Sequence, residues 1–197
     1  MKKGVFKKPT QVKINARSSS ITNAFINGIV PAPDPTDDEI QRALEVLGMT
    51  EDTVQCAYCG NPVTEWDHFH PLIVDRDATG YITEIHNLVP ACGKCNQSKG
   101  NKDWKTWIYS NAKQSPKTKG VTDLDERVKR LEEYERQFTC ARYDFKAIVG
   151  EELWNEHMDN REKILELMKK AQTTSDKIKQ IIDQAVKNGK AEKYDKI

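Results

Sequence analysis

The sequence lacks any long apolar run. Charged residues make up 31% of its 197 positions, the mean hydropathy is −0.75, and no stretch approaches the ~20 apolar residues that a membrane-spanning helix needs. Lys2 and Lys3 resemble the basic start of a signal peptide, but the apolar segment that should follow is missing. We therefore expect no membrane segment, no secretion and a cytoplasmic protein.

Acidic residues are absent from one segment and scarce in another. Residues 1–33 carry six basic side chains and no acid, and residues 93–119 carry seven lysines against Asp103 alone. The acids gather mostly in residues 34–52 and 123–166. The net charge of +1 thus hides two basic segments, which favour a single surface that faces a polyanion. The alternative is a solvated tail together with a solvated helix face.

Two segments have the composition of linkers. "PAPDPT" (31–36) contains three prolines, which remove backbone donors and disfavour a helix before them, and "SPKTKG" (115–120) is the second. The predicted organisation is a basic N-terminal arm with its linker (1–35), a core (36–112) and a helical C-terminal region (113–197).

Periodicity and capping residues predict the elements between these linkers. Thr36 is a suitable N-cap, acids fill the first turn after it, and Gly48 ends the apolar stripe. Residues 1–30 show no clear period, and "RSSSITN" within them is typical of a turn. The other predicted elements are strands at about 63–74 and 81–90 joined by a turn at "DRDATG", a helix from Cys95 or Asn96 with a break at Gly100, and helices at 122–138, 151–171 and 175–188.

Four of the five cysteines form two close pairs. "CAYC" and "CGKC" supply Cys56, Cys59, Cys92 and Cys95, and two such pairs in a chain without a secretion signal favour a zinc ion over disulfides. The alternative is two unrelated reduced pairs. The 32 residues between the pairs have the length of one hairpin, so zinc would join the base of this hairpin to the start of a helix. Cys140 is expected to be a small buried apolar residue.

The segment "VTEWDHFHPLIV" (63–74) has the composition of a strand, yet Asp67 and His68 interrupt it. An unpaired buried polar group costs roughly 1–3 kcal/mol, so these side chains need partners. "DHFHP", "HNL" and "CGKCNQSKG", in this order and inside the four-cysteine frame, resemble the three sequence blocks of the HNH endonucleases. The resemblance covers roughly residues 54–105. It implies an α+β fold, with a zinc-stapled ββα-metal core between a basic N-terminal arm and helical C-terminal elements.

The same resemblance implies roles for individual residues. His68 is the expected general base, Asp67 and Asn96 hold a catalytic Mg²⁺ or Mn²⁺, Asn87 braces the hairpin, and Lys99 lies beside the phosphate. Elementary chemistry agrees, because a histidine with a pKa near 6.5 can accept a proton at neutral pH and hard cations prefer oxygen ligands. Asn96 stands where the family often has histidine, which is the HNN variant and disfavours a softer metal.

The sequence leaves open whether Asp67 and His68 share a face and what His70 and His86 do. Neighbouring residues of a regular strand point to opposite faces, so Asp67 and His68 share a site only if the strand bends or ends there, as Pro71 permits. His70 and His86 are additional candidates, either for packing or for substrate contact.

Together these features predict a metal-dependent endonuclease that hydrolyses double-stranded DNA, as a type II-like restriction enzyme encoded by a bacterium or phage. One ββα-metal site cuts one strand, so double-strand cleavage calls for a homodimer, and the C-terminal helices are expected to serve dimerisation or DNA docking. The alternatives are a homing, phage-associated or toxin HNH nuclease and, from a different class, a non-catalytic zinc-stabilised DNA-binding module. The joint presence of the five polar site residues favours the enzyme.

Overall fold

The structure, a computed structural model, describes residues 7–190. Their backbone contacts divide them into two compact units. One unit comprises residues 26–149, and the other combines residues 7–25 with residues 150–190. Across the described part of the chain, no helix is both long enough and apolar enough to cross a bilayer.

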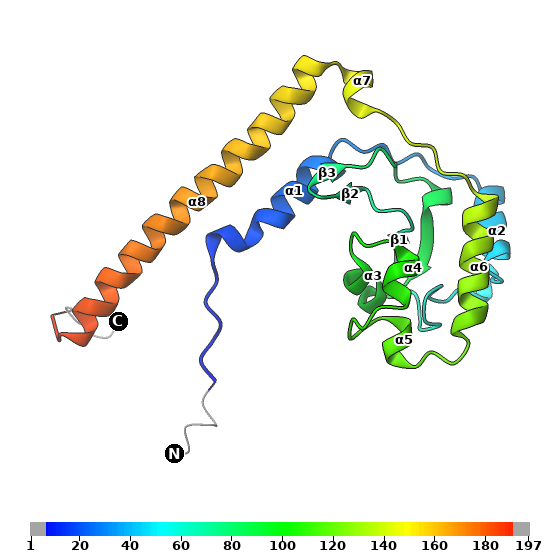
Figure 1. Cartoon of the computed structure of the whole chain (residues 1–197), viewed down its shortest axis with the longest axis horizontal. Coiled ribbons are helices and arrows are strands. Elements are labelled where there is room, and N and C mark those ends of the chain that lie inside the picture. The colour runs from blue at the N-terminus through cyan, green and yellow to red at the C-terminus, as the bar shows by residue number, and fades with distance from the viewer. Residues whose placement is uncertain (1–6, 191–197) are drawn as a thin grey trace. The chain divides into compact units, whose positions relative to one another are not determined.

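The larger unit is built around two short antiparallel strand pairs (Figure 1). Strand β1 (Glu65–His68) pairs with β4 (Leu88–Ala91), which places Asp67 opposite Val89 and His68 opposite Leu88. Strand β2 (Ile73–Val74) pairs with β3 (Asp77–Ala78). The predicted mixed fold of helices and a small sheet is confirmed.

The predicted strands are shorter and more broken than expected. The expected strand at 63–74 ends at His68 and resumes only at β2, and the expected strand at 81–90 is irregular until the 3-10 turn η3 (Ile85–Asn87). The physical reason lies in the Asn87 side chain, which bonds the backbone of His70 and Ile82 where a strand ladder would otherwise run.

Besides η3, the larger unit contains seven helical elements. They are α2 (Asp37–Val46), η2 (Glu51–Thr53), α3 (Gly93–Lys99), α4 (Trp104–Ile108), α5 (Pro116–Lys119), α6 (Leu124–Gln137) and α7 (Phe145–Val149). Thr36 caps α2 as predicted, in a capping box with Glu39.

Two predictions for these helices were wrong in detail. Helix α3 begins at Gly93, two residues before the predicted start, because Cys92 already takes the extended N-cap conformation, and it ends at the predicted break, Gly100. The predicted linker at 115–120 contains the short helix α5. Ser115 caps it by accepting a hydrogen bond from the Thr118 N–H, and Pro116 occupies the first helical position, where its fixed φ suits a helix.

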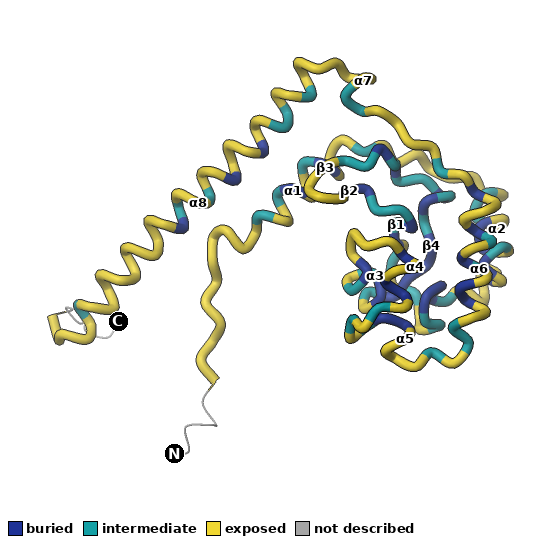
Figure 2. The backbone as a smooth tube through the Cα atoms, in the orientation of Figure 1, coloured by how far each residue is buried: buried dark blue, intermediate teal, exposed yellow. Residues whose placement is uncertain are grey.

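Aromatic side chains hold α4 and α6 against the strand pair. The ring of Phe69, just after β1, stacks on Trp104 of α4 at 5.1 Å and meets Tyr134 of α6 edge-on at 5.8 Å. The Tyr134 hydroxyl donates to the backbone carbonyls of Ile85 and Leu88, which fixes the start of β4. Figure 2 shows buried residues in β4, α4 and α6, and Asp67 is the buried residue of β1. The core therefore lies directly beneath the segment that carries Asp67 and His68.

The smaller unit consists of η1 (Ile14–Arg17), the first eight residues of α1 (Ser18–Asn27) and α8 (Glu151–Lys187). The turn-like stretch that starts at Arg17 thus begins a helix, contrary to prediction. Side chains reinforce it, because the Thr22 hydroxyl bonds the Ser18 carbonyl one turn earlier. Within this unit the Ile14 N–H donates to the side-chain oxygen of Gln172 at 2.6 Å.

The two helices predicted at 151–171 and 175–188 are one continuous helix, α8. The sequence at the expected break is Thr173-Thr174-Ser175. The hydroxyls of Thr173 and Thr174 bond the carbonyls of Lys169 and Lys170, four residues earlier. Such back-bonding satisfies these hydroxyls inside a helix, so the polar stretch does not end it.

Candidate active site

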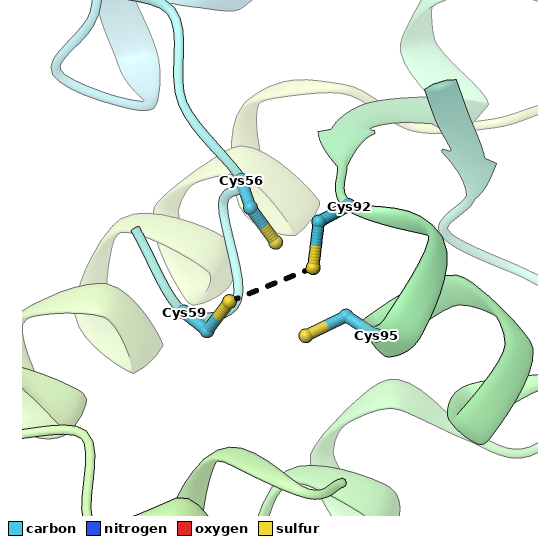
Figure 3. A group of neighbouring side chains, drawn as sticks. All are labelled: Cys56, Cys59, Cys92 and Cys95. Atoms are coloured by element: carbon cyan, nitrogen blue, oxygen red, sulfur yellow. Dashed lines mark hydrogen bonds between the residues drawn. The ribbon is translucent and has the colours of Figure 1, made fainter. Parts of the chain in front are cut away.

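The four paired cysteines converge on one point. Their sulfur atoms all lie within 4.8 Å of one another (Figure 3), and the sulfurs of Cys59 and Cys92 are 3.7 Å apart. A tetrahedral zinc ion with bonds of about 2.3 Å to sulfur separates its ligands by about 3.8 Å. The spacing, the all-thiol donor set and the burial of three of the four residues therefore suit a closed zinc site, and the predicted cluster is confirmed.

Backbone hydrogen bonds shape both cysteine turns. The Gly60 N–H donates to the Cys56 carbonyl at 2.8 Å, and the Cys95 N–H donates to the Cys92 carbonyl at 2.9 Å. Gly60 has a φ of +74°, a conformation that other residues adopt at a cost. The buried guanidinium of Arg127 also donates to the Cys56 carbonyl, which ties α6 to this turn.

Tyr58 joins the cysteine cluster to Asp67. It lies between Cys56 and Cys59 in the sequence, is fully buried, and donates from its hydroxyl to Oδ2 of Asp67 at 2.7 Å. Burial raises the pKa of the Tyr58 hydroxyl well above its usual value, and the negative charge of Asp67 raises it further. The hydroxyl therefore remains a proton donor, and the cysteine turn positions one oxygen of Asp67.

Asp67 forms a buried ion pair with Lys99. Only 4% of Asp67 is exposed, and the Lys99 ammonium lies 3.1 Å from its Oδ2. The same ammonium donates to the backbone carbonyl of His68 at 2.7 Å. Burial raises the pKa of Asp67 and lowers that of Lys99, while the attraction between the two charges opposes both shifts. Asp67 is thus a buried carboxylate that is paired with the Lys99 ammonium.

His68 lies at the end of β1 with a half-buried imidazole. Its Nε2 is 2.9 Å from the Thr83 hydroxyl. Burial lowers the pKa of the imidazole to about 4, with a further lowering by the positive charge of Lys99. The ring is therefore neutral at physiological pH and has a nitrogen able to accept a proton. Lys99 contacts both neighbours, because it binds the side chain of Asp67 and the backbone of His68.

Asn87 is fully buried behind this strand end. Its side-chain oxygen accepts from the His70 N–H at 2.8 Å, and its amide nitrogen donates to the carbonyls of His70 and Ile82. Its own carbonyl accepts from the Phe69 N–H at 2.8 Å. Three of these bonds hold Phe69 and His70, the two residues that follow His68, and the fourth holds Ile82, at the position where the family resemblance places a bracing asparagine.

Asn96 lies on α3, across from β1. Its side-chain nitrogen donates to Oε2 of Glu65 at 2.9 Å, and Asn96 is partly exposed. Because the amide nitrogen is engaged, the amide oxygen is the atom left for a further partner.

The other histidines have aromatic neighbours. His70 stacks on Tyr81 with ring centres 4.7 Å apart, and its Nε2 lies 3.9 Å from a carboxylate oxygen of Glu135. His86 stacks on Phe138 at 4.6 Å. Both contacts are those of packing residues, although His70 remains partly exposed at the surface. Cys140 is half-buried and donates from its sulfur to the His86 carbonyl, so it is less buried than predicted.

Sequence reasoning did not single out Tyr58, Glu65 or Thr83. For Glu65 a signal was present, since residues two apart on a strand share a face and Glu65 precedes Asp67 by two positions. Tyr58 and Thr83 carried no comparable signal. Their partners lie 9 and 15 residues away in the chain and meet them only through the fold.

Known proteins are similar to this chain over the region that carries the candidate site. The HNH endonuclease family matches residues 56–102. The CRISPR-associated endonuclease Cas9 of Corynebacterium diphtheriae is 44% identical over 62 residues, a match that covers 29% of this chain and 5% of that protein. No solved structure matches the chain.

Proposed function

We propose that the chain hydrolyses phosphodiester bonds in duplex DNA through residues 56–102, the region that matches the HNH endonuclease family. One observation carries the proposal. The neutral imidazole of His68 directly follows, on β1, the buried carboxylate of Asp67, which faces the positive charge of Lys99. A proton acceptor beside a cation-binding carboxylate is the arrangement that metal-dependent hydrolysis requires.

Zinc is the metal that we assign to the four-cysteine cluster. The site is closed by four thiolates, which leaves no position for a substrate, so its role is structural. Through Tyr58, a zinc ion held there would also fix the orientation of Asp67.

Asp67 and Asn96 are the residues that would hold a catalytic Mg²⁺ or Mn²⁺. A carboxylate and an amide oxygen are the hard ligands that such cations prefer, and the Asp67 carboxylate already faces the positive charge of Lys99, which supports this assignment. When bound, such a cation supplies charge neutralisation for the phosphate and for the leaving 3′ oxygen.

The protein's own residues supply the remaining steps. His68 removes a proton from the attacking water, with the Thr83 hydroxyl 2.9 Å from its Nε2 to orient the ring. Asn87 holds the backbone after His68 so that the imidazole keeps its place. Lys99, one turn after Asn96 on α3, was expected beside the phosphate, but its side chain is fully buried and binds Asp67 and the His68 carbonyl, so its proposed role is to position these two residues.

The proposed substrate and assembly follow from the similarity to Cas9 and from the charge of the chain. The Cas9 relative supports DNA, and the lysines of residues 93–119 supply positive charge close to the site in sequence. The arm (1–35) and the helical region (113–197) are the proposed segments for DNA docking or dimerisation. A homodimer would cut both strands, as a type II-like restriction enzyme acting in the cytoplasm does, and homing, phage-associated and toxin nucleases share the same site chemistry.

Brief chelation is expected to separate the two metals. EDTA should abolish cleavage while the fold persists, because two protein oxygens hold the catalytic cation loosely and four thiolates hold zinc tightly. Added Mg²⁺ or Mn²⁺ should restore cleavage, and Zn²⁺ should not. The measurement is nicking of plasmid DNA with parallel circular dichroism and zinc analysis.

Asp67→Asn is the matched variant for this experiment. It should keep DNA binding and zinc while losing cleavage at every Mg²⁺ concentration tested. Cleavage that persists in EDTA, or that only Zn²⁺ revives, would refute the hard-metal assignment.

A further inference from the structure

Glu65 is a polar residue of the site that has no role in the mechanism above. It lies on β1 two positions before Asp67, so the two carboxylates share a face of the strand. Its Oε2 accepts the hydrogen bond from Nδ2 of Asn96 at 2.9 Å. We propose that Glu65 is a positioning residue that holds the Asn96 side chain with its amide oxygen turned toward the catalytic cation. The inference rests on the proposed function, in which Asn96 is a ligand of that cation.

The oxygen and the nitrogen of the Asn96 side-chain amide differ in what they can bind. Rotation of the Asn96 side chain by half a turn exchanges an oxygen, which can bind a cation, with an NH₂ group, which cannot. A carboxylate has only acceptors, so Glu65 can pair with the NH₂ group and never with the oxygen. A hydrogen bond to an ionised acceptor is also stronger than one between neutral groups. Glu65 therefore selects the rotamer that presents the oxygen.

The position of Glu65 is itself constrained by α3. A Cβ atom built at Gly93 would lie 2.7 Å from Oε1 of Glu65, closer than real Cβ contacts come. The Gly93 N–H donates to the Thr64 hydroxyl at 3.0 Å, which holds the first turn of α3 against β1. The absence of a side chain at Gly93 is thus what lets the Glu65 carboxylate extend over α3 toward Asn96.

This arrangement provides two independent ways to disturb one contact. Glu65→Ala removes the acceptor. Gly93→Ala leaves the carboxylate intact but requires it to move, and the atom that must shift is the far end of a flexible side chain, so the fold should adapt. Glu65→Gln is the conservative counterpart, because its side-chain oxygen can still accept from Asn96 while the negative charge is lost.

The test is the affinity of the full-length, zinc-loaded protein for Mn²⁺, followed by electron paramagnetic resonance of the free ion. Outer partners of metal ligands typically contribute 10–100-fold to affinity, so Glu65→Ala should weaken Mn²⁺ binding by about 10-fold or more. Gly93→Ala should weaken it in the same direction. Glu65→Gln should lose less affinity than Glu65→Ala, because its oxygen still accepts from Asn96 although its NH₂ group no longer excludes the flipped amide, and all three should keep their zinc and their melting temperature within a few degrees.

Asn96→Ala distinguishes failure of this inference from failure of the proposed function. If Asn96→Ala binds Mn²⁺ as the wild type does, the proposed cation site is wrong. If Asn96→Ala loses affinity while Glu65→Ala and Gly93→Ala keep it, only the role of Glu65 is wrong. Equal losses in Glu65→Gln and Glu65→Ala would overturn the positioning role in favour of Glu65 as a charged ligand. Should Glu65→Ala not fold, the comparison of Glu65→Gln with Gly93→Ala decides.

Discussion

Cys92→Ser is expected to unfold the HNH domain rather than merely to slow cleavage. A structural zinc site contributes about 10–16 kcal/mol of apparent binding free energy, and that energy is folding free energy when the site does not exist in the unfolded chain. The β1–β4 pair has only four residues on each strand, so the strands alone offer little to replace it. Cys92 also directly precedes α3, so the loss of its bond to zinc releases the start of the helix that carries Asn96 and Lys99. Zinc content and thermal unfolding are the measurements.

Cys140→Ser is the matched control for this variant. Cys140 is a free cysteine outside the cluster, and a serine hydroxyl can replace its sulfur as donor to the His86 carbonyl. The control should bind one zinc per chain and melt like the wild-type protein. A Cys92→Ser protein that lacks zinc yet keeps the wild-type melting temperature would contradict the structural role of the cluster.

His68→Ala is expected to reduce the cleavage rate by about 10²–10⁴-fold, the usual cost of losing a general base. Fold and DNA binding should be nearly unchanged, since the variant removes no proposed metal ligand and no zinc ligand. The half-buried position of the ring limits the loss of packing. Single-turnover cleavage of a labelled duplex, together with a binding isotherm at fixed salt, separates the two effects.

His157→Ala serves as the control for His68→Ala. His157 lies on α8 in the smaller unit, where its Nε2 contacts the Phe25 carbonyl, so its removal should leave cleavage intact. Near-wild-type cleavage by His68→Ala would move the base to His70 or His86. The stacking of both rings on aromatic neighbours disfavours that outcome.

The site was largely predictable where residues close in sequence carry the chemistry. Cys56 and Cys59 form one turn, and Cys92 and Cys95 form another, so each pair could be recognised from its spacing alone. The fold had only to bring the two turns together to complete the cluster. The prediction that Asp67 needs a partner was also sound, but spacing did not show that Tyr58 and Lys99 are those partners.

The rest depended on tertiary contacts that local patterns do not encode. The strand expected at 81–90 gives way to an irregular segment because the Asn87 side chain bonds the backbone of His70, 17 residues away. The polar stretch around Thr173 looked like a break, yet hydroxyl bonds to the preceding turn keep α8 continuous. The contact between Glu65 and Asn96 joins residues 31 positions apart. The partners of Asn87 and Glu65 lie outside the window in which periodicity is read, and the bonds that keep α8 continuous are local but are not visible in a pattern of apolar residues.

Incubation of the purified wild-type chain with supercoiled plasmid and Mg²⁺, followed by sequencing of the DNA ends, tests the central claim most directly. A site that activates water and releases the 3′ oxygen should convert the plasmid to nicked or linear DNA with 5′-phosphate and 3′-hydroxyl ends. The same incubation with His68→Ala should leave it supercoiled. Intact plasmid after incubation with folded, zinc-loaded wild-type protein that binds DNA would contradict the assignment and favour a non-catalytic DNA-binding module.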